Sequence, residues 1–213
     1  MLTINEIFYS IQGESTRAGS PCVFVRLTAC DLRCTWCDTP YAFYEGTKRS
    51  IAEVVAEVES YGCPLVEITG GEPLLQDDVY PLMERLLAGG HTVMLETGGH
   101  RSIAAVPPGV IKVMDVKCPG SGESEKNDWR NLDLLAPQDE VKFVIQDRAD
   151  YDFALEVMKR YGVASRAGGV LFSPVHGVLD PKTLSGWMLA DHVAARLQFQ
   201  IHKLIWPPAT RGV

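Results

Sequence analysis

The chain has 213 residues, of which 46% are hydrophobic and 22% charged, so one domain spanning residues 1–213 can bury a core. Its formal net charge of −7 argues against a nonspecific nucleic-acid binder and gives no reason to expect a membrane surface as partner. The N-terminus lacks a signal-peptide pattern and no apolar run reaches membrane-span length, so we expect a cytoplasmic protein whose clustered cysteines bind metal.

The first predicted strand, over residues 5–14, breaks at Gly13 between Gln12 and Glu14. An amide, a glycine that permits close approach and a carboxylate together suit the edge of a nitrogen heterocycle. An ordinary polar turn has the same composition and is the alternative interpretation.

The next strand, residues 22–28, alternates between aliphatic residues and the set Phe24, Arg26 and Thr28. Arg26 therefore lies opposite the aliphatic face, just before a group of cysteines. A planar guanidinium there can bind a substrate carboxylate through two hydrogen bonds. The alternative is a surface arginine that forms local ion pairs.

Three cysteines follow this strand in one short segment, Cys30, Cys34 and Cys37. Three thiolates from one loop can hold three irons of a 4Fe–4S cube and leave the fourth iron open for a substrate or cosubstrate. Structural zinc needs four closed ligands, and no His lies within about fifty residues downstream of Cys37. A zinc site and three thiols that merely pack in the interior are the two alternatives.

Ser50 and Glu53 form a capping box that begins a helix through about residue 61, and a buried strand follows over residues 65–69. This strand ends in the turn Gly70-Gly71-Glu72-Pro73. Two glycines let a ligand approach the backbone closely, and the following carboxylate and peptide groups can bind an ammonium group. A simple strand-to-helix turn is the alternative, but the pairing with the cysteine triad favours a binding function.

The remaining chain continues the alternation of helices and strands. We expect helices over residues 79–88, 150–161 and 180–195, and strands over residues 92–96, 110–117, 140–145, 169–175 and 197–202. Residues 100–109 are too short and Pro-rich for a crossover helix, and residues 120–128 predict a mobile, solvated loop.

The last predicted strand carries Gln198, Gln200 and His202 on one face. In a barrel wrapped by helices the outer face is apolar, so these polar side chains are expected to face the lumen. His202 is thus a candidate substrate contact, and a His on a solvated edge strand is the alternative.

Strands that alternate with helices predict an α/β fold with a parallel, right-handed sheet. Because helices are fewer than strands, we expect an incomplete (β/α) barrel. The cysteine loop and the turns at Gly71, Lys117 and Ser173 all follow strands. They should therefore gather at the C-terminal mouth, where such sheets place their sites.

The cysteine spacing Cys-x3-Cys-x2-Cys, with Trp36 before the third cysteine, resembles the signature of the radical S-adenosylmethionine (SAM) enzymes. The resemblance implies a barrel of the radical SAM type and a 4Fe–4S cluster on the three cysteines. It further implies that SAM chelates the open iron and is cleaved to a 5′-deoxyadenosyl radical by an electron from the cluster. The Gly-Gly-Glu turn would then hold the methionine amino group of SAM.

A closer resemblance extends from residue 5 to about residue 206. The sequence is similar to the 7-carboxy-7-deazaguanine synthase family in Glu6–Glu14, Phe24–Leu27, Trp36–Thr39, Thr69–Gln76, Asp115–Pro119 and Gln200–Lys203. That family converts 6-carboxy-5,6,7,8-tetrahydropterin to 7-carboxy-7-deazaguanine with loss of ammonia, a carbon–nitrogen lyase reaction of queuosine-type 7-deazapurine biosynthesis. SAM acts there as a cofactor and is restored at the end of each turnover.

The family resemblance also implies the roles of individual residues. Thr39 would be the protein ligand of a magnesium ion beside the substrate carboxylate, since Mg²⁺ prefers oxygen and keeps few protein ligands. The residues implied to hold the substrate are Ile11, Gln12, Gly13, Glu14, Arg26 and Thr69, with His202 as the further candidate. The residues implied to hold SAM are Gly71, Glu72, Lys117, Cys118, Pro119, Ser173, Pro174, Val175 and His176.

The implied partners are a small pterin, a flavodoxin-like or other electron donor and a second copy of the chain in a homodimer. Two features depart from the family. Many members end near a proline whose carboxylate reaches the substrate, whereas this chain continues from Trp206 to Val213 and leaves Pro207 and Val213 both open for that role. The SAM turn at Ser173 also lacks the Ser-Pro-Lys form of some members.

Two other functions share the cysteine triad. A radical SAM activating enzyme, which generates a glycyl radical on a partner protein, is also small but needs a protein-docking surface rather than a closed polar pocket. A zinc-binding interaction module is the non-enzymatic alternative. Iron and sulfide content would separate that module from both enzymes, and turnover of the pterin would separate the two enzymes.

Overall fold

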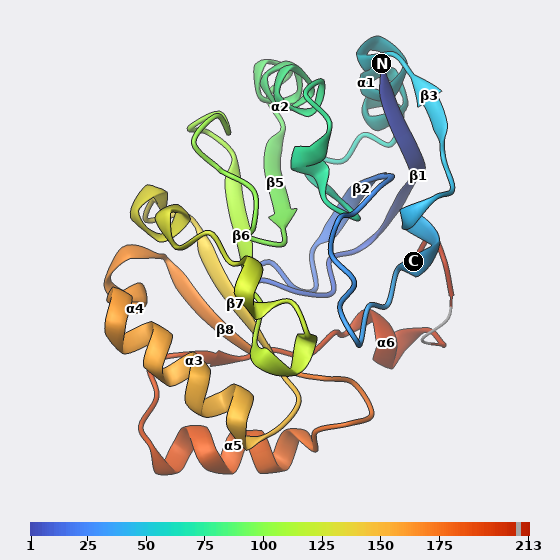
Figure 1. The fold of residues 1–213 in the computed structure, drawn as a ribbon. Helices are drawn as coiled ribbons and strands as arrows, with labels where there is room; N and C mark the ends of the chain where they lie inside the picture. Colours follow the sequence, from blue (N-terminus) through green and yellow to red (C-terminus); the bar gives the residue numbers. More distant parts are fainter. Residues whose placement is uncertain (208–209) are drawn as a thin grey trace.

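The computed structural model describes residues 1–207 and 210–213, and its strands form one sheet (Figure 1). The strand order is β3-β1-β2-β4-β5-β6-β7-β8-β9. The strands are β1 (Leu2–Ile11), β2 (Pro21–Leu27), β3 (Thr47–Arg49), β4 (Leu65–Gly70), β5 (Thr92–Thr97), β6 (Ile111–Val116), β7 (Glu140–Ile145), β8 (Gly169–Pro174) and β9 (Arg196–Leu197).

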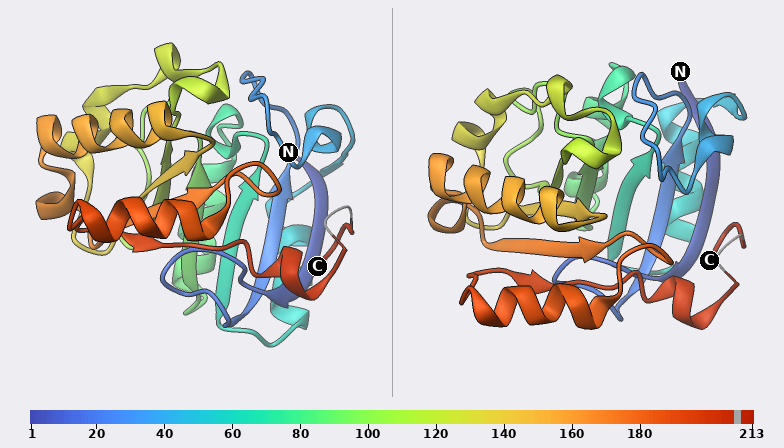
Figure 2. Two further views of the ribbon diagram at one scale, coloured as in Figure 1. Left: turned by 90° about the horizontal axis from the view of Figure 1, so that it is seen from below. Right: turned by 60° about the horizontal axis from the view of Figure 1, so that its bottom comes forward.

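The sheet is parallel from β2 to β9 and antiparallel only at its first edge. β1 runs antiparallel to both β2 and β3, whereas each neighbouring pair from β2–β4 to β8–β9 is parallel. Within the described residues β3 and β9 end the sheet without pairing to each other, so the barrel stays open (Figure 2). The predicted incomplete barrel is therefore confirmed.

The helices of ten or more residues cover the outer face of this curved sheet. The α-helices are α1 (Ile51–Ser60), α2 (Val79–Ala88), α3 (Arg148–Tyr161), α4 (Val163–Arg166), α5 (Pro181–Ala190) and α6 (His202–Ile205). Short 3-10 turns are η1 (Pro40–Phe43), η2 (Pro73–Leu75), η3 (Pro119–Ser121), η4 (Ser124–Lys126) and η5 (Trp129–Leu134). Among the described residues, no helix is both long and apolar enough to cross a membrane.

The hydrophobic core lies between the sheet and these helices. The β2 side chains of Val23, Val25 and Leu27 are fully buried, and each such burial contributes about 1.5–3 kcal/mol. Figures 1 and 2 show α3 and α5 side by side along one flank, where the rings of Tyr151 and Trp187 lie 5.4 Å apart. Because apolar residues fill the outer layer, the alternate polar residues of the same strands point to the inside of the barrel.

Local sequence signals set most element boundaries. The capping box is formed as predicted. The Ser50 side chain accepts a hydrogen bond from the backbone amide of Glu53, and the Glu53 side chain accepts one from the backbone amide of Ser50. β7 spans the residues predicted for it, and no helix lies between β5 and β6. The helix predicted to reach residue 195 ends at Ala190, because His192 takes a left-handed conformation with φ of 51°.

Two predictions on irregular segments were wrong. Residues 120–128 form turns rather than a solvated loop, and Ser121 and Glu123 are buried because they contact the cysteine loop. The strand predicted over residues 197–202 stops at Leu197. Beyond it, hydrogen bonds to the Gly13–Ser15 turn replace the sheet ladder, because the polar side chains of this segment are paired with that turn.

Candidate active site

One cavity of about 330 Å³ opens at the C-terminal ends of the strands. The cysteine loop and the turns after β4, β6 and β8 all line it, which confirms that these turns gather at one mouth. The predicted site residues in its wall are Ile11, Gln12, Gly13, Glu14, Arg26, Cys30, Cys34, Cys37, Thr39, Thr69, Gly71, Glu72, Lys117, Ser173, Val175, His176 and His202. Cys118, Pro119 and Pro174 do not line it, and Cys118 is buried away from the opening.

The cysteine loop is positioned by backbone contacts with the turn after β4. The amide of Glu72 donates to the Ala29 carbonyl at 2.8 Å, and the Ala29 amide donates to the Ala42 carbonyl at 2.9 Å. A Cβ on Gly71 would overlap that same Ala29 carbonyl, and one on Gly70 would overlap the Leu27 backbone. The two glycines therefore allow the cysteine loop to pack against this turn, in addition to any access they give a ligand.

The three thiols of this loop are half-buried and face the cavity. Burial raises the pKa of Cys30 and of Cys34, and the nearby Lys117 partly offsets this for Cys34. In the described ranges, no three His, Cys, Asp or Glu side chains are grouped closely enough to hold a single metal ion. Each thiolate of an iron–sulfur cube binds a different iron, so its sulfurs lie farther apart than the ligands of one ion.

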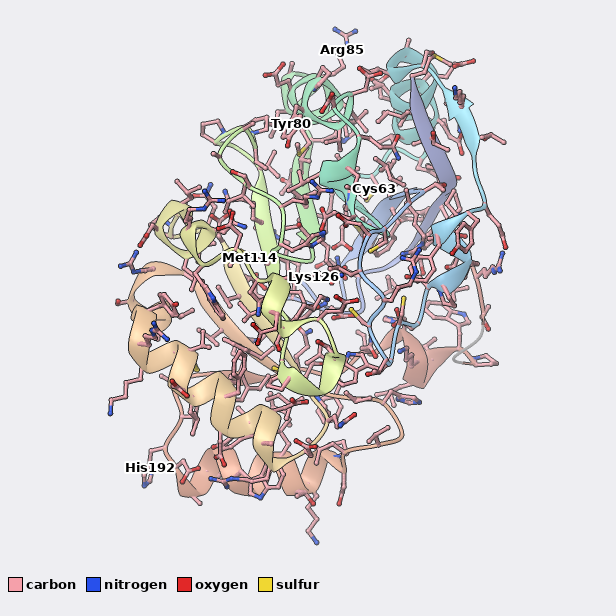
Figure 3. The ribbon with its side chains drawn as sticks, viewed as in Figure 1. Cys63, Tyr80, Arg85, Met114, Lys126 and His192 are labelled. Carbon is pink, nitrogen blue, oxygen red and sulfur yellow. The ribbon has the colours of Figure 1, made fainter. Side chains whose placement is uncertain are left out.

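The outer side of the cysteine loop is covered by the turns that follow β6. The Arg33 amide donates to Glu123 Oε1 at 2.5 Å, and Thr35 Oγ1 donates to the Gly120 carbonyl at 2.9 Å. Lys126, labelled in Figure 3, lies over the same loop with Nζ 3.4 Å from the Asp31 carbonyl. The loop is thus fixed on both sides by segments distant in the sequence.

Glu72 joins the ends of β4 and β5 from a fully buried position. Its carboxylate accepts from Leu74 N at 3.0 Å, Gly98 N at 2.8 Å and Thr97 Oγ1 at 2.9 Å. Burial raises the pKa of this carboxyl group despite these donors. A ligand ammonium group at this turn therefore meets a carboxylate that is already oriented by three donors.

Lys117 and Asp115 face the cavity from the end of β6. Lys117 Nζ donates to Asp115 Oδ2 at 2.7 Å. Burial alone would lower the pKa of Lys117, but Asp115 and Cys34 raise it above its ordinary value, so the amine is charged. Asp115 Oδ1 is buried and lacks a hydrogen-bond partner among the described residues, so it is available to a donor group of a ligand.

The floor of the cavity is a buried charge network around Lys142 of β7. Its ammonium group contacts Glu96 and lies 3.0 Å from Glu14 Oε2. Burial alone would lower the pKa of Lys142, but the two carboxylates raise it well above its ordinary value. Burial opposes the ionisation of Glu96, yet Lys142 lowers the pKa of that group, so the pair is ionised.

Glu67 of β4 lies beside this network and behaves differently. It accepts a hydrogen bond from Gln12 Nε2. The Oε1 atom of Gln12 in turn accepts a hydrogen bond from the Glu14 amide at 3.0 Å. Burial and the charge of Glu96 raise the pKa of Glu67 well above its ordinary value. The floor therefore places Glu67, whose pKa is raised, beside Glu96, whose pKa is lowered, and such a set can pair with the donor and acceptor edge of a heterocycle.

The segment after β9 closes one side of the floor. Gln198 Nε2 and Gln200 Nε2 donate to Glu14 at 3.0 and 2.9 Å. His202 packs on Gly13, where a Cβ would overlap its ring. Burial lowers the pKa of His202, so the ring in the cavity wall is neutral at pH 7. Of the three polar side chains expected to face the lumen, Gln200 and His202 line the cavity and Gln198 does not, and none of them lies on a strand.

Arg26 lies in the cavity wall and also has a local partner. Its Nε donates to Glu6 Oε1 at 2.7 Å, and its guanidinium lies 5.7 Å from the centre of the Phe8 ring. Within residues 1–207 and 210–213 its two terminal amino groups donate no hydrogen bond, so they remain available to a ligand carboxylate. Val213 also lines the cavity, whereas Pro207 does not; Pro208 and Ala209 lie outside the described residues.

Four charged residues of the site were not singled out individually in the sequence, where Glu96 belongs to a polar strand end that is a candidate wall and Asp115 to a block of the family resemblance: Glu67, Glu96, Asp115 and Lys142. All four lie on the inner face of strands, and Glu67, Asp115 and Lys142 are each less than 9% exposed. The signal that could have revealed them is an ionisable residue inside an otherwise apolar strand, since such a residue is almost never buried unless it is paired.

A family model described as the radical SAM superfamily matches residues 25–176. A 7-carboxy-7-deazaguanine synthase of Koribacter versatilis is 50% identical over all of both chains, and one of Chlorobaculum tepidum is 43% identical over 100% of this chain and 97% of its own. A crystal structure of QueE from Escherichia coli has a TM-score of 0.75 with 22% identity over 93% of each chain, a likeness of fold.

Proposed function

The chain belongs to the radical SAM superfamily and, within it, to the 7-carboxy-7-deazaguanine synthase family, and we propose that it is a lyase that converts 6-carboxy-5,6,7,8-tetrahydropterin to 7-carboxy-7-deazaguanine and ammonia. The observation that carries this proposal is that one cavity joins the three cysteines to a floor of paired charges. Similarity over the whole chain favours a pterin over the protein substrate of a glycyl-radical activating enzyme.

The cysteine side of the cavity fits an iron–sulfur cluster and SAM. Three free thiols from one loop would hold three irons, and an open cavity beside them leaves room for a further ligand on the fourth. When bound, the cluster and SAM supply the radical that removes a hydrogen atom from the pterin. The chain's own contribution is to hold the cluster and SAM with the cavity-lining residues Gly71, Glu72, Lys117, Ser173, Val175 and His176, and Asp115 Oδ1 offers a further acceptor there.

The charged floor suits the pterin ring. Its 2-amino-4-oxo pyrimidine presents both donors and acceptors, which match the Gln12 amide and the carboxyl groups of Glu67 and Glu14. Lys142 Nζ holds the Glu14 carboxyl group in place through their 3.0 Å contact. Arg26 would bind the substrate carboxylate through its terminal amino groups. Ile11, Gly13, Thr69 and the neutral His202 would complete the wall around the ring.

Other parts of the proposal concern groups outside the chain. Thr39 lines the cavity next to the cysteine loop and would be the protein ligand of a magnesium ion that also contacts the substrate carboxylate. A flavodoxin-like or other one-electron donor reduces the cluster, and two chains form a homodimer. We also propose that residues 1–213 act as one domain in the reducing cytoplasm, where six cysteines remain free.

The decisive experiment is anaerobic reconstitution with iron and sulfide, followed by incubation with SAM, a reductant, Mg²⁺ and the pterin, and mass spectrometry of the products. We expect the deazaguanine acid and one ammonia per pterin consumed, and a lower rate without Mg²⁺. SAM cleavage that leaves the pterin intact would overturn the proposed substrate. A protein that takes up no cluster would overturn the whole proposal.

A further inference from the structure

Asp38 and Lys203 belong to two blocks of the family resemblance and have no role of their own in the function proposed above, yet they meet in the structure. Lys203 Nζ lies 2.9 Å from Asp38 Oδ2, and Gln200 Nε2 donates to the same oxygen at 3.1 Å. Lys203 Nζ also donates to Gln200 Oε1 at 2.7 Å. We call Asp38, Gln200 and Lys203 the Asp38 latch.

The latch connects the two walls of the cavity. Asp38 lies directly after the third cysteine of the loop, so its position is tied to the cysteine side. The amide of Gln200 that reaches Asp38 also donates to Glu14 at 2.9 Å, and Glu14 belongs to the charged floor. One side-chain amide thus links both walls, and Lys203 fixes the other end of that amide.

No long element of secondary structure holds the latch in place. β9 has two residues and α6 has four, and residues 198–201 between them are irregular. Their position depends on bonds to the other walls, such as Ile201 N to the Gly13 carbonyl at 3.0 Å. The side chain of Lys203 is only 10% exposed, so its ammonium group is held among these partners rather than in bulk water.

We propose that Lys203 is a positioning residue that acts through Asp38 and Gln200 to hold the cysteine loop and Glu14 at a fixed separation. The inference rests on the proposed function, in which SAM binds at one wall and the pterin at the other. Hydrogen transfer between them requires close approach, and a misplacement of about 1 Å can cost roughly 100-fold in rate. Without the latch, SAM cleavage continues but is poorly coupled to the pterin.

The test compares Lys203→Met with the unaltered enzyme after equal cluster loading. In the unaltered enzyme SAM is restored, so product exceeds free 5′-deoxyadenosine. In Lys203→Met we expect product formation to fall about 10-fold and the KM for the pterin to rise, while free 5′-deoxyadenosine per product rises at least 10-fold. Iron content and the electron paramagnetic resonance (EPR) spectrum of the reduced cluster should stay unchanged. Lys203→Arg, which keeps the charge, should restore most of the coupling.

Lys159→Met provides the matched control, since Lys159 is an exposed lysine on the outer helix α3. It should match the unaltered enzyme in every measurement. Unchanged coupling in Lys203→Met, or parallel loss of cluster and of both products, would overturn the inference and leave the proposed function intact. Absence of product from the unaltered enzyme would instead overturn the proposed function and this inference with it.

Discussion

The two walls of the cavity are built in different ways. The cysteine wall is held by backbone contacts, in which the Ala29 carbonyl receives the Glu72 amide and packs against Gly71. The floor is held by side-chain charges, in which Lys142 lies between Glu14 and Glu96. Substitutions in the cysteine wall should therefore act by steric overlap and by changing the backbone conformation. Substitutions in the floor should act by leaving charges unpaired.

This difference matches what each wall has to do. A cluster needs three ligands at fixed positions, and backbone packing against the turn after β4 supplies much of that rigidity, with a few polar side chains on the outer side of the loop. A heterocycle with several donors and acceptors needs oriented side chains, and a buried network supplies them at the cost of desolvating every charge in it. The predictions below test this contrast.

The largest effect is expected for removal of a cluster ligand. Cys34→Ala should abolish cluster loading and all turnover, because a loop with two thiols holds only two of the three irons. Iron and sulfide analysis and the 400 nm absorbance after reconstitution would measure it. Cys63→Ala is the control, since Cys63 is a buried thiol that does not line the cavity and should load normally. A loaded Cys34→Ala protein would contradict the assignment.

The floor should be most sensitive at its central charge. Lys142→Met leaves the half-buried Glu14 and Glu96 without a cation, and breaking a buried pair in this way costs at most about 3–5 kcal/mol. For a chain of this size that lowers Tm by about 10 °C. A thermal melt of the reconstituted protein would measure it. The double variant Lys142→Met/Glu96→Gln should recover part of the loss, and a Tm equal to that of the unaltered protein would contradict the network.

The cysteine wall should respond to one added methyl group. Gly70 has φ of 143° and a Cβ there would overlap the Leu27 backbone. Gly70→Ala should cost about 1–3 kcal/mol in strain and reduce iron content by displacing the loop. Gly62→Ala is the matched control, because Gly62 also has a positive φ but open space around it. Equal iron content in the two variants would contradict packing as the role of Gly70.

A smaller effect is expected at the proposed carboxylate contact. Arg26→Ala should spare the cluster and raise the KM for the pterin about 10- to 100-fold, the equivalent of the about 1.5–3 kcal/mol of a hydrogen bond to a charged group. Steady-state kinetics at equal iron content would measure it. Unchanged KM would show that Arg26 serves only its pair with Glu6.

The smallest effect is expected for the protonation of His202. Burial lowers the pKa of His202, so its ring should titrate below its ordinary value near 6.5. Protonation is then harder in the folded protein than in the unfolded chain, so this group's contribution to stability is present above pH 6.5 and is lost as pH falls through its folded pKa. NMR titration of the imidazole, assigned with His202→Gln, would measure it, and a midpoint at or above 6.5 would contradict the burial of the ring.

Much of the fold could be predicted because its signals are local. Alternation in residues 22–28 placed Arg26 inside, and the capping box fixed the start of α1. The segment after β9 shows the limit of such signals. Its alternation predicted a strand, but hydrogen bonds from Gln198 and Gln200 to Glu14 take the place of strand pairing. Because Glu14 is distant along the chain, a local sequence pattern cannot indicate this contact.

By itself the sequence determined the cysteine loop, the Gly-Gly-Glu turn and the family, because these are short blocks in which every functional residue is a neighbour of the next. Only the tertiary structure decided how Glu67, Glu96 and Lys142 combine into one floor, and that Asp38 meets Lys203. The physical reason is that the energy of a buried charge depends on which charges lie beside it. Those neighbours come from different strands, and only folding brings them within hydrogen-bond distance.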